Sequence, residues 1–517
     1  MTDPDARGGV DELVADTFRT FVPDVTGSAP TTWKDVACAH HRRIRRAQRR
    51  RITATCVVMV VVALAVGIPA VISGSGHGTD RHVPLGGGPS LPAQSILDRS
   101  GQVLTGFGET AGLQAGYGSA IPPGSGDRLV TNIDGPLQNT LQQALDTQVA
   151  NLNGRVDPST KQTVESAQGA VVALDPQTGA VLALAWTGPT SPGLDPVTDS
   201  PATPGAVFDL VTATAALQDG LITPTSLYND TGQFVIPGCV AQAPGCVPYT
   251  DNNASAAGYV NVSSALAVSS DTFFDNLGAE FWDSRSQYGT EPIQNVAAQY
   301  GYGQTTGIDL PGEDAGSYGQ VDSPTVVAKE HAQDPAAYPY GSWATGNNVQ
   351  MAAGLGGTTA TPLQEAVAYA TFANGGTRYT PRIAARIVDP HGNPVKTITA
   401  PAVGQVTMTA AEHQALTAGF TGAVGGPGSE VQTPPGSAAA AFQGFPISTF
   451  PIAGKTGYGG ANDTLPASTF VGWGPTDHPT VLIATVIYAA GFGASPAAAV
   501  ARAGFQEVID QPIPPLS

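Results

Sequence analysis

The chain has 517 residues, enough for roughly two or three domains with full hydrophobic cores. Its hydrophobic content of 41% is ordinary for a folded protein, whereas only 12% of its residues are charged. The formal net charge of −18 argues against a nucleic-acid partner, because proteins that bind nucleic acid present basic surfaces.

A membrane anchor is predicted near the N-terminus. Residues 52–72 form an uncharged, mainly apolar run of 21 residues, and seven arginines lie between residues 42 and 51. As a helix this run spans about 30 Å, the thickness of a bilayer core. The arginines place the N-terminus in the cytoplasm and the rest of the chain outside. A cleaved signal peptide fits less well, because its apolar region is shorter and nearer the start of the chain.

Composition predicts four regions. Residues 1–51 are a basic cytoplasmic tail and residues 52–72 are the transmembrane helix. Residues 73–127 begin with a Gly-, Pro- and Ser-rich linker and continue as a short stalk. Residues 128–517 hold the main folded domain.

Within the main domain, apolar patterning predicts strands at both ends and helices between them. Residues 169–186 read as a β-hairpin around Asp-Pro-Gln-Thr-Gly. Helices are predicted at 204–220, at 262–277 as a short pair around Ser269, and at 497–509. Strands are predicted at 452–456, 468–473 and 480–488. The ends of the chain must therefore meet in one antiparallel sheet flanked by helices, an α+β arrangement.

The cysteines agree with an extracytoplasmic domain. Cys239 and Cys246 lie on the outer side, and in an oxidising compartment they predict a small loop-closing disulfide. Cys38 and Cys56 lie in the tail and the span, where they stay reduced. Two thiols without neighbouring histidines do not favour a zinc site, and we expect neither metal nor cofactor.

Several ordered motifs carry a family resemblance. Near the C-terminus stands Lys455-Thr456-Gly457, upstream of it Ser269-Ser270-Asp271, and before that Pro204-Gly205-Ala206-Val207-Phe208-Asp209. Further matches are Ser95–Leu104, the LVTNIDGPLQNTLQQAL segment from residue 129, Tyr300–Glu313 and Thr361–Gly376. In this order the motifs resemble the class B penicillin-binding proteins, the membrane-anchored transpeptidases that cross-link peptidoglycan.

The resemblance implies a penicillin-binding protein/β-lactamase-like transpeptidase fold over about residues 128–512 of the 128–517 domain. It also implies a bacterial cell membrane location and partners among the proteins of cell-wall synthesis. Only about thirty residues separate the first two landmarks, so the larger pedestal domain of the family is expected to be absent or reduced to a stalk.

The central catalytic motif departs from the family. There, the serine of Ser-x-x-Lys attacks the D-Ala-D-Ala carbonyl and the lysine activates it. Here Ala206 occupies the serine position and Asp209 the lysine position. No other Ser-x-x-Lys can substitute, because the residues three positions before the five lysines are Thr31, Pro158, Val326, Asn393 and Ile452.

The remaining motif positions form the expected ligand-binding set, Ser269, Asp271, Lys455, Thr456 and Gly457. Lys455 with Asp209 and Asp271 gives a formal pocket charge of −1, which repels a substrate carboxylate. We hypothesise that Asp209 pairs with Lys455. The alternative is that these residues have only structural roles. Asp209 then faces solvent, Asp271 caps a helix, Ser269 is an ordinary turn serine and Lys455 is a solvated edge-strand residue.

Three functions remain open on these residues. The first is a transpeptidase-like scaffold or regulator without catalysis. The second is an active D,D-transpeptidase or carboxypeptidase with a displaced nucleophile, Ser269 or Ser270 with Asp271, although a carboxylate without an intervening histidine activates serine poorly. The third is a sensor that binds a peptidoglycan stem peptide or a β-lactam non-covalently through Lys455 and Thr456.

Overall fold

The computed structural model describes residues 96–514 apart from gaps, the longest being 189–195, 240–247, 251–255, 314–317, 426–435 and 461–464. The predicted tail at 1–51 and span at 52–72 lie outside the described residues. Within the described part, no helix has both the length and the apolar character needed to cross a bilayer.

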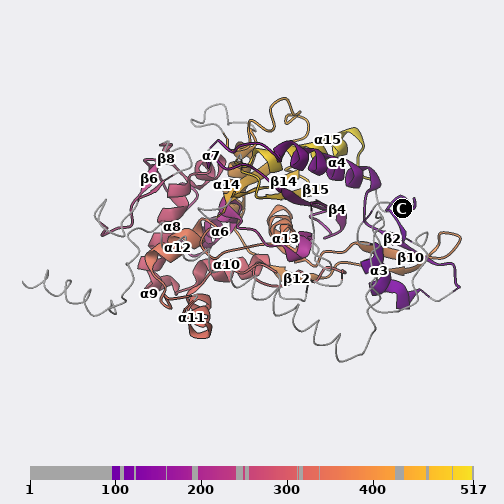
Figure 1. The fold of residues 1–517 in the computed structure, drawn as a ribbon, viewed down its shortest axis with the longest axis horizontal. Helices are drawn as coiled ribbons and strands as arrows, with labels where there is room; N and C mark the ends of the chain where they lie inside the picture. Colours follow the sequence, from indigo (N-terminus) through magenta and orange to yellow (C-terminus); the bar gives the residue numbers. More distant parts are fainter. Residues whose placement is uncertain are drawn as a thin grey trace, which may run out of the picture.

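A five-stranded antiparallel sheet forms the centre of the molecule (Figure 1). Its strand order is β13-β14-β15-β3-β4, so the last three strands of the chain join a hairpin formed nearly three hundred residues earlier. Val172 of β3 lies opposite Ala484 of β15. The predicted meeting of the chain ends in one antiparallel sheet is thus confirmed. The strands are β3 (Gln168–Leu174), β4 (Val181–Thr187), β13 (Ala453–Gly459), β14 (Ala467–Gly474) and β15 (Val481–Tyr488).

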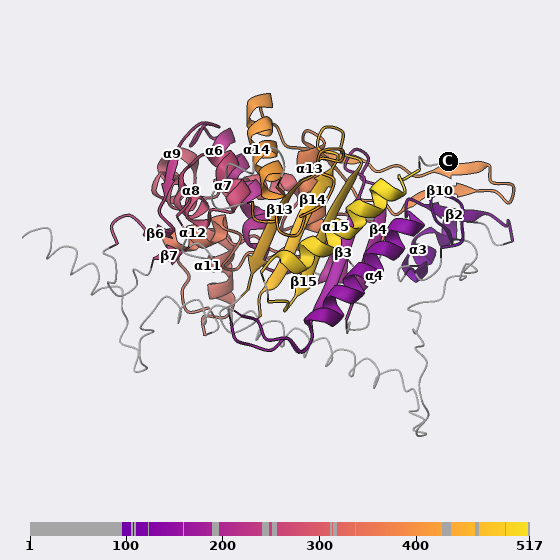
Figure 2. The ribbon, with the colours of Figure 1, turned by 90° about the horizontal axis from the view of Figure 1, so that it is seen from above.

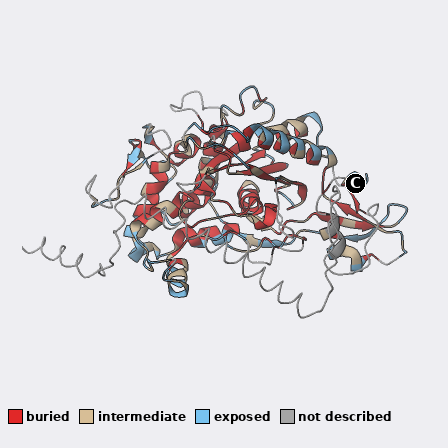
Figure 3. Cartoon of the chain, viewed as in Figure 1, coloured by how far each residue is buried: buried red, intermediate tan, exposed pale blue. Residues whose placement is uncertain are grey.

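Both faces of this sheet are buried, and alternate side chains belong to different cores. Val171 and Ile483 point to a core shared with α4 (Gly135–Leu152) and α15 (Ser495–Asp510), which lie side by side across the sheet (Figure 2). Val172 and Leu482 point to the opposite core, with α13 (Pro362–Ala373). Because each strand is covered on both sides, its residues form the nearly continuous buried runs seen in Figure 3.

A lobe of helices packs against the β13 edge and positions the candidate site. The chain enters this lobe through the 3₁₀ turn η4 (Gly205–Phe208) and continues directly into α6 (Asp209–Gln218). The short helices predicted around Ser269 are α7 (Val262–Val268) and α8 (Asp271–Asp283). The other helices are α5 (Pro196–Asp199), α9 (Arg285–Tyr288), α10 (Pro292–Tyr300), α11 (Pro324–Gln333), α12 (Thr345–Ala352) and α14 (Ala410–Ala423).

A second, smaller sheet lies at the far end from this lobe, with strand order β1-β2-β10-β11 (Figure 1). It joins the stalk segment to the main domain, since β1 pairs with β2 and β2 with β10. Its strands are β1 (Ile96–Leu97), β2 (Arg128–Thr131), β10 (Ala384–Val388) and β11 (Pro394–Thr397); the remaining elements are α3 (Thr110–Tyr117), η3 (Gly118–Ala120), β5 (Tyr228–Asp230), β6 (Gln233–Phe234), β7 (Tyr249–Thr250), β8 (Gly258–Val260), β9 (Thr377–Tyr379) and β12 (Ala402–Gln405).

Candidate active site

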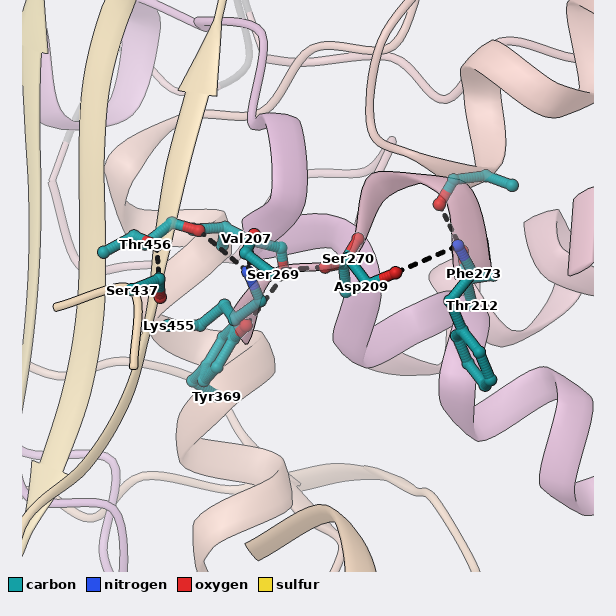
Figure 4. Close-up of polar contacts among 11 residues, drawn as sticks. Val207, Asp209, Thr212, Ser269, Ser270, Phe273, Tyr369, Ser437, Lys455 and Thr456 are labelled. Atoms are coloured by element: carbon teal, nitrogen blue, oxygen red, sulfur yellow. Dashed lines mark hydrogen bonds and ion pairs between the residues drawn. The ribbon is translucent and has the colours of Figure 1, made fainter. Parts of the chain in front are cut away.

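Three segments that are far apart in the sequence meet beside β13 (Figure 4). The Lys455 ammonium lies 3.3 Å from the Asp209 carboxylate at the start of α6. The same ammonium donates a hydrogen bond of 2.8 Å to the Ser269 hydroxyl, between α7 and α8. The hypothesis that Asp209 pairs with Lys455 is therefore confirmed.

Glycines allow β13 and η4 to come this close. Gly205 has φ +56°, and a Cβ there would come within 2.7 Å of the Tyr458 carbonyl oxygen. On the opposing strand, a Cβ at Gly457 would come within 2.2 Å of the Pro204 carbonyl oxygen. Any larger residue at either position would push the two backbones apart, so Gly457 serves here as a contact between the motifs.

The Ser269 backbone adopts the left-handed conformation, with φ 58° and ψ 58°, as the C-cap of α7. A residue with a side chain pays about 1–3 kcal/mol for this conformation, which persists only where the surroundings impose it. Here the hydrogen bond to buried Lys455 is one such constraint. The interpretation of Ser269 as an ordinary turn serine is therefore wrong.

The two residues after Ser269 have separate roles. Ser270 caps α8 by accepting a hydrogen bond from the Phe273 amide, and its hydroxyl donates to the Asp230 carboxylate at 2.7 Å. Asp271 is the first residue of the helix itself, so its assignment as the N-cap is wrong. Both Ser and Asp are favourable N-cap residues. Because α7 ends with Ser269 as its C-cap, the next residue, Ser270, becomes the N-cap of α8.

The ion pair lies inside the protein. The Lys455 side chain is 0% exposed and that of Asp209 is 3% exposed, so the solvent-facing interpretations of both residues are wrong. Burial raises the pKa of Asp209 to about 8, the Lys455 charge opposes this, and the Asp271 charge adds to it.

Ala206 differs from its neighbours in exposure. Gly205, Val207 and Phe208 are buried, whereas Ala206 is partly exposed. A partly exposed methyl group therefore stands at the position where the family resemblance requires a hydroxyl. It cannot form an ester, and no acyl-enzyme can form at this position.

The Thr456 hydroxyl has a hydrogen-bond partner, Ser437, that the sequence does not indicate. Its Oγ1 donates to Ser437 Oγ at 2.8 Å, while the Ser437 amide donates to the Ala267 carbonyl at 3.0 Å. Ser437 thereby connects the end of α7 to β13. It lies just after residues 426–435 in a Gly-, Pro- and Ala-rich stretch, where no spacing rule singles out one serine.

Other predicted positions lie away from this cluster. Cys239 is disulfide-bonded, and Cys246 lies outside the described residues, so their pairing stays a prediction. Among the residues that the structure describes, no three His, Cys, Asp or Glu side chains are placed to hold a metal ion.

Comparison with known proteins gives a consistent result. A family model described as the penicillin binding protein transpeptidase domain matches residues 169–506. The peptidoglycan D,D-transpeptidase MrdA of Acinetobacter baumannii is 26% identical over 63% of this chain and 48% of its own length. Penicillin-binding protein PbpB of Mycobacterium tuberculosis is 27% identical over 64% of this chain and 43% of its own length. The chain thus matches about half the length of these relatives.

Solved structures show the same fold. The D,D-transpeptidase domain of a peptidoglycan glycosyltransferase from Eggerthella lenta superposes with a TM-score of 0.59 at 19% identity, covering 80% of this chain and 97% of that domain. Pseudomonas aeruginosa PBP2, solved in complex with WCK 5153, gives a TM-score of 0.55 at 24% identity, covering 75% of this chain and 76% of that one.

Proposed function

Because the chain belongs to the penicillin-binding protein transpeptidase family, we propose that it is a membrane-anchored protein of peptidoglycan synthesis that has lost acyl transfer. In this proposal its transpeptidase domain is a scaffold or regulator for proteins that build the cell wall. The observation that carries the proposal is the buried pair of Asp209 and Lys455, 3.3 Å apart, beside a motif whose nucleophile position is Ala206.

Two chemical arguments support the loss of catalysis. Acyl transfer needs an oxygen nucleophile and a base within hydrogen-bond reach of it. Ala206 offers no oxygen, and the base position holds Asp209, whose carboxyl is committed to Lys455. Lys455 has no exposed surface with which to attract a substrate carboxylate.

The geometry does not favour either alternative. A displaced nucleophile at Ser270 conflicts with its role, since its buried hydroxyl donates to Asp230. At Ser269, the hydroxyl accepts a hydrogen bond from the Lys455 ammonium, which cannot act as a base while it holds that proton. A sensor that uses the Lys455 charge would first have to expose a side chain that is 0% exposed.

A fluorescent penicillin tests this proposal directly. We expect the wild-type protein to form no covalent adduct, as measured by in-gel fluorescence and intact-mass spectrometry. We expect Ala206→Ser combined with Asp209→Lys to restore labelling by at least about a thousandfold over background, since losing a nucleophile costs a serine hydrolase on the order of 10⁶ in turnover. Adding Asp271→Asn removes the remaining motif anion and should raise labelling further.

Matched single variants separate the two losses. Ala206→Ser alone has a nucleophile without its base, and Asp209→Lys alone has a base without a nucleophile; neither should label above background. A stable drug adduct on the wild-type protein would refute the proposal. The scaffold role further predicts that a deletion strain is complemented equally well by the wild-type gene and by the Ala206→Ser variant, which keeps the Asp209–Lys455 pair.

A further inference from the structure

A second buried acid lies behind the degenerate motif, on α13. Glu365 is 0% exposed, and neither of its carboxyl oxygens has a hydrogen-bond partner among the described protein atoms. The Tyr302 hydroxyl, which follows α10, is likewise buried without such a partner. Gln364, the residue before Glu365, donates a hydrogen bond of 2.8 Å to the Gln304 carbonyl, which holds the segment that contains Tyr302 against the start of α13. Tyr302 also belongs to the same buried cluster as the apolar residues of α13.

Two tyrosines near Glu365 contact the segment between Ala206 and Asp209. Tyr369 lies four residues after Glu365, on the same face of α13, and its hydroxyl donates to the Val207 carbonyl at 2.8 Å. The Tyr302 ring packs edge-on against Phe208, with ring centres 5.3 Å apart. Val207 and Phe208 are the residues between Ala206 and Asp209, so this cluster supports η4 from its buried side.

We propose that Glu365 is a neutral carboxylic acid in the folded protein, that it hydrogen-bonds to the Tyr302 hydroxyl through internal water, and that loss of its proton weakens the support of η4. Buried polar groups are nearly always satisfied, and internal water typically makes about three hydrogen bonds in such places. A protonated carboxyl and a phenol supply both donors and acceptors for that water. An ionised carboxylate there would have to break this arrangement or pay a large desolvation cost.

The pKa of Glu365 is raised by its burial, and the titratable groups around it are as follows. Burial alone raises its pKa well above the ordinary value of 4.5. Tyr300, Tyr302 and Tyr369 have raised pKa values and stay neutral. The charge of Lys455 lowers the pKa of Asp209 and so acts against the effect of its burial. The other titratable side chains on the elements packed against α13 are Asp199 on α5, Arg378 and Tyr379 on β9, and Tyr488 on β15.

The stability consequence follows from proton linkage. The unfolded chain loses the Glu365 proton near pH 4.5, whereas the folded protein keeps it to much higher pH. Over that window the folded state binds more protons, so stability falls as pH rises. The unfolding constant gains about a factor of ten per pH unit from this one group.

Urea unfolding of the full-length protein between about pH 5 and pH 9 tests this with Glu365→Gln and Glu365→Leu. Gln keeps the shape and hydrogen bonds without a titrating proton, so it should match the wild type near pH 5 and become more stable by up to about tenfold in the unfolding constant per pH unit above it. Leu should be less stable than Gln at every pH, because it leaves Tyr302 and the water without a partner. If the ratio of the unfolding constants of the wild type and Glu365→Gln does not change with pH, the proposal that Glu365 is protonated is wrong. If Glu365→Leu is more stable than Glu365→Gln, the proposed water bridge is wrong.

Infrared spectroscopy of the wild-type protein keeps the proposal testable if a variant fails to fold. At about pH 9 ordinary carboxyl groups are ionised, and Asp209, with its pKa of about 8, is largely ionised as well. A remaining carbonyl band of a protonated acid, absent from Glu365→Gln where that variant folds, is the expected signature. Its absence from the wild type would overturn the proposal.

Discussion

Replacing Lys455 by Met is expected to lower the free energy of unfolding by about 3–5 kcal/mol above roughly pH 8, because it leaves one member of a buried ion pair without its partner. The two side chains are 0% and 3% exposed, and their charged atoms lie 3.3 Å apart, so water cannot replace the missing charge. Urea unfolding followed by circular dichroism measures the loss.

The loss should shrink as the pH falls. Burial raises the pKa of Asp209 from 3.8 to about 8, so the folded protein binds more protons than the unfolded chain between these values, and this acid costs stability as pH rises through that window. At about pH 5 the raised pKa of Asp209 leaves the carboxyl neutral in wild type and variant alike. Removing the ammonium then costs mainly its hydrogen bonds to Ser269 and the Thr456 carbonyl, about 1–3 kcal/mol together.

The double variant Asp209→Leu/Lys455→Met is the matched control. It removes both charges while keeping similar side-chain volume, and such replacements are often neutral or stabilising by about 1–4 kcal/mol. We therefore expect the double variant to recover most of the stability lost above pH 8. An equal loss from Lys455→Met at pH 5 and pH 9, or no recovery in the double variant, would contradict an ion pair of this kind.

Much of the fold could be predicted because its strands and helices carry local signals. The hairpin at 169–186 appears as β3 and β4, paired from Gly169 opposite Thr187 to Leu174 opposite Val181. The three C-terminal strand segments appear as β13, β14 and β15, although β13 runs from Ala453 to Gly459, beyond the predicted end. Boundaries differ because glycines such as Gly457 and Gly459 read as turns in sequence but pair with β14.

The pairing of Asp209 with Lys455 could be predicted from the family resemblance together with the charges of the two residues. Both residues occupy motif positions that the family fold brings together, and a lysine in such a cleft needs an anionic partner. Their depth could not be predicted. The burial of Lys455 depends on Ser269, which it contacts, and on η4, which packs against β13. Ser437 bonds to the next residue, Thr456, and these partners come from three separate parts of the chain.

The burial of Glu365 could not be predicted from the sequence. It lies in PLQEAVAYATFA, where a single acid in a helix normally marks the exposed face. In this helix nearly every residue is buried, because α13 packs against the sheet on one side and α10 on another. No helical period can show that an acid is buried when the helix has no exposed face.

The second large effect is expected at Gly354, which follows α12. Replacing it by Ala should lower the free energy of unfolding by about 2–4 kcal/mol, as measured by urea unfolding. Its φ is +67°, and a Cβ would come within 2.2 Å of the Gly205 carbonyl oxygen and 2.6 Å of the Phe208 Cβ. The Gly205 amide also donates to the Gly354 carbonyl at 3.1 Å, so neither backbone can retreat without losing this contact.

Gly220→Ala is the matched control, because Gly220 has φ +70° and nothing lies within 4 Å of its Cβ position. It should cost only the conformational term, about 1–2 kcal/mol. If both variants lose the same unfolding free energy, the contact between Gly354 and η4 can accommodate a Cβ atom without cost. If the contact is tight, a Cβ at 354 must displace Gly205 and with it the start of α6. In the Ala206→Ser/Asp209→Lys background, Gly354→Ala should then reduce penicillin labelling while Gly220→Ala leaves it unchanged.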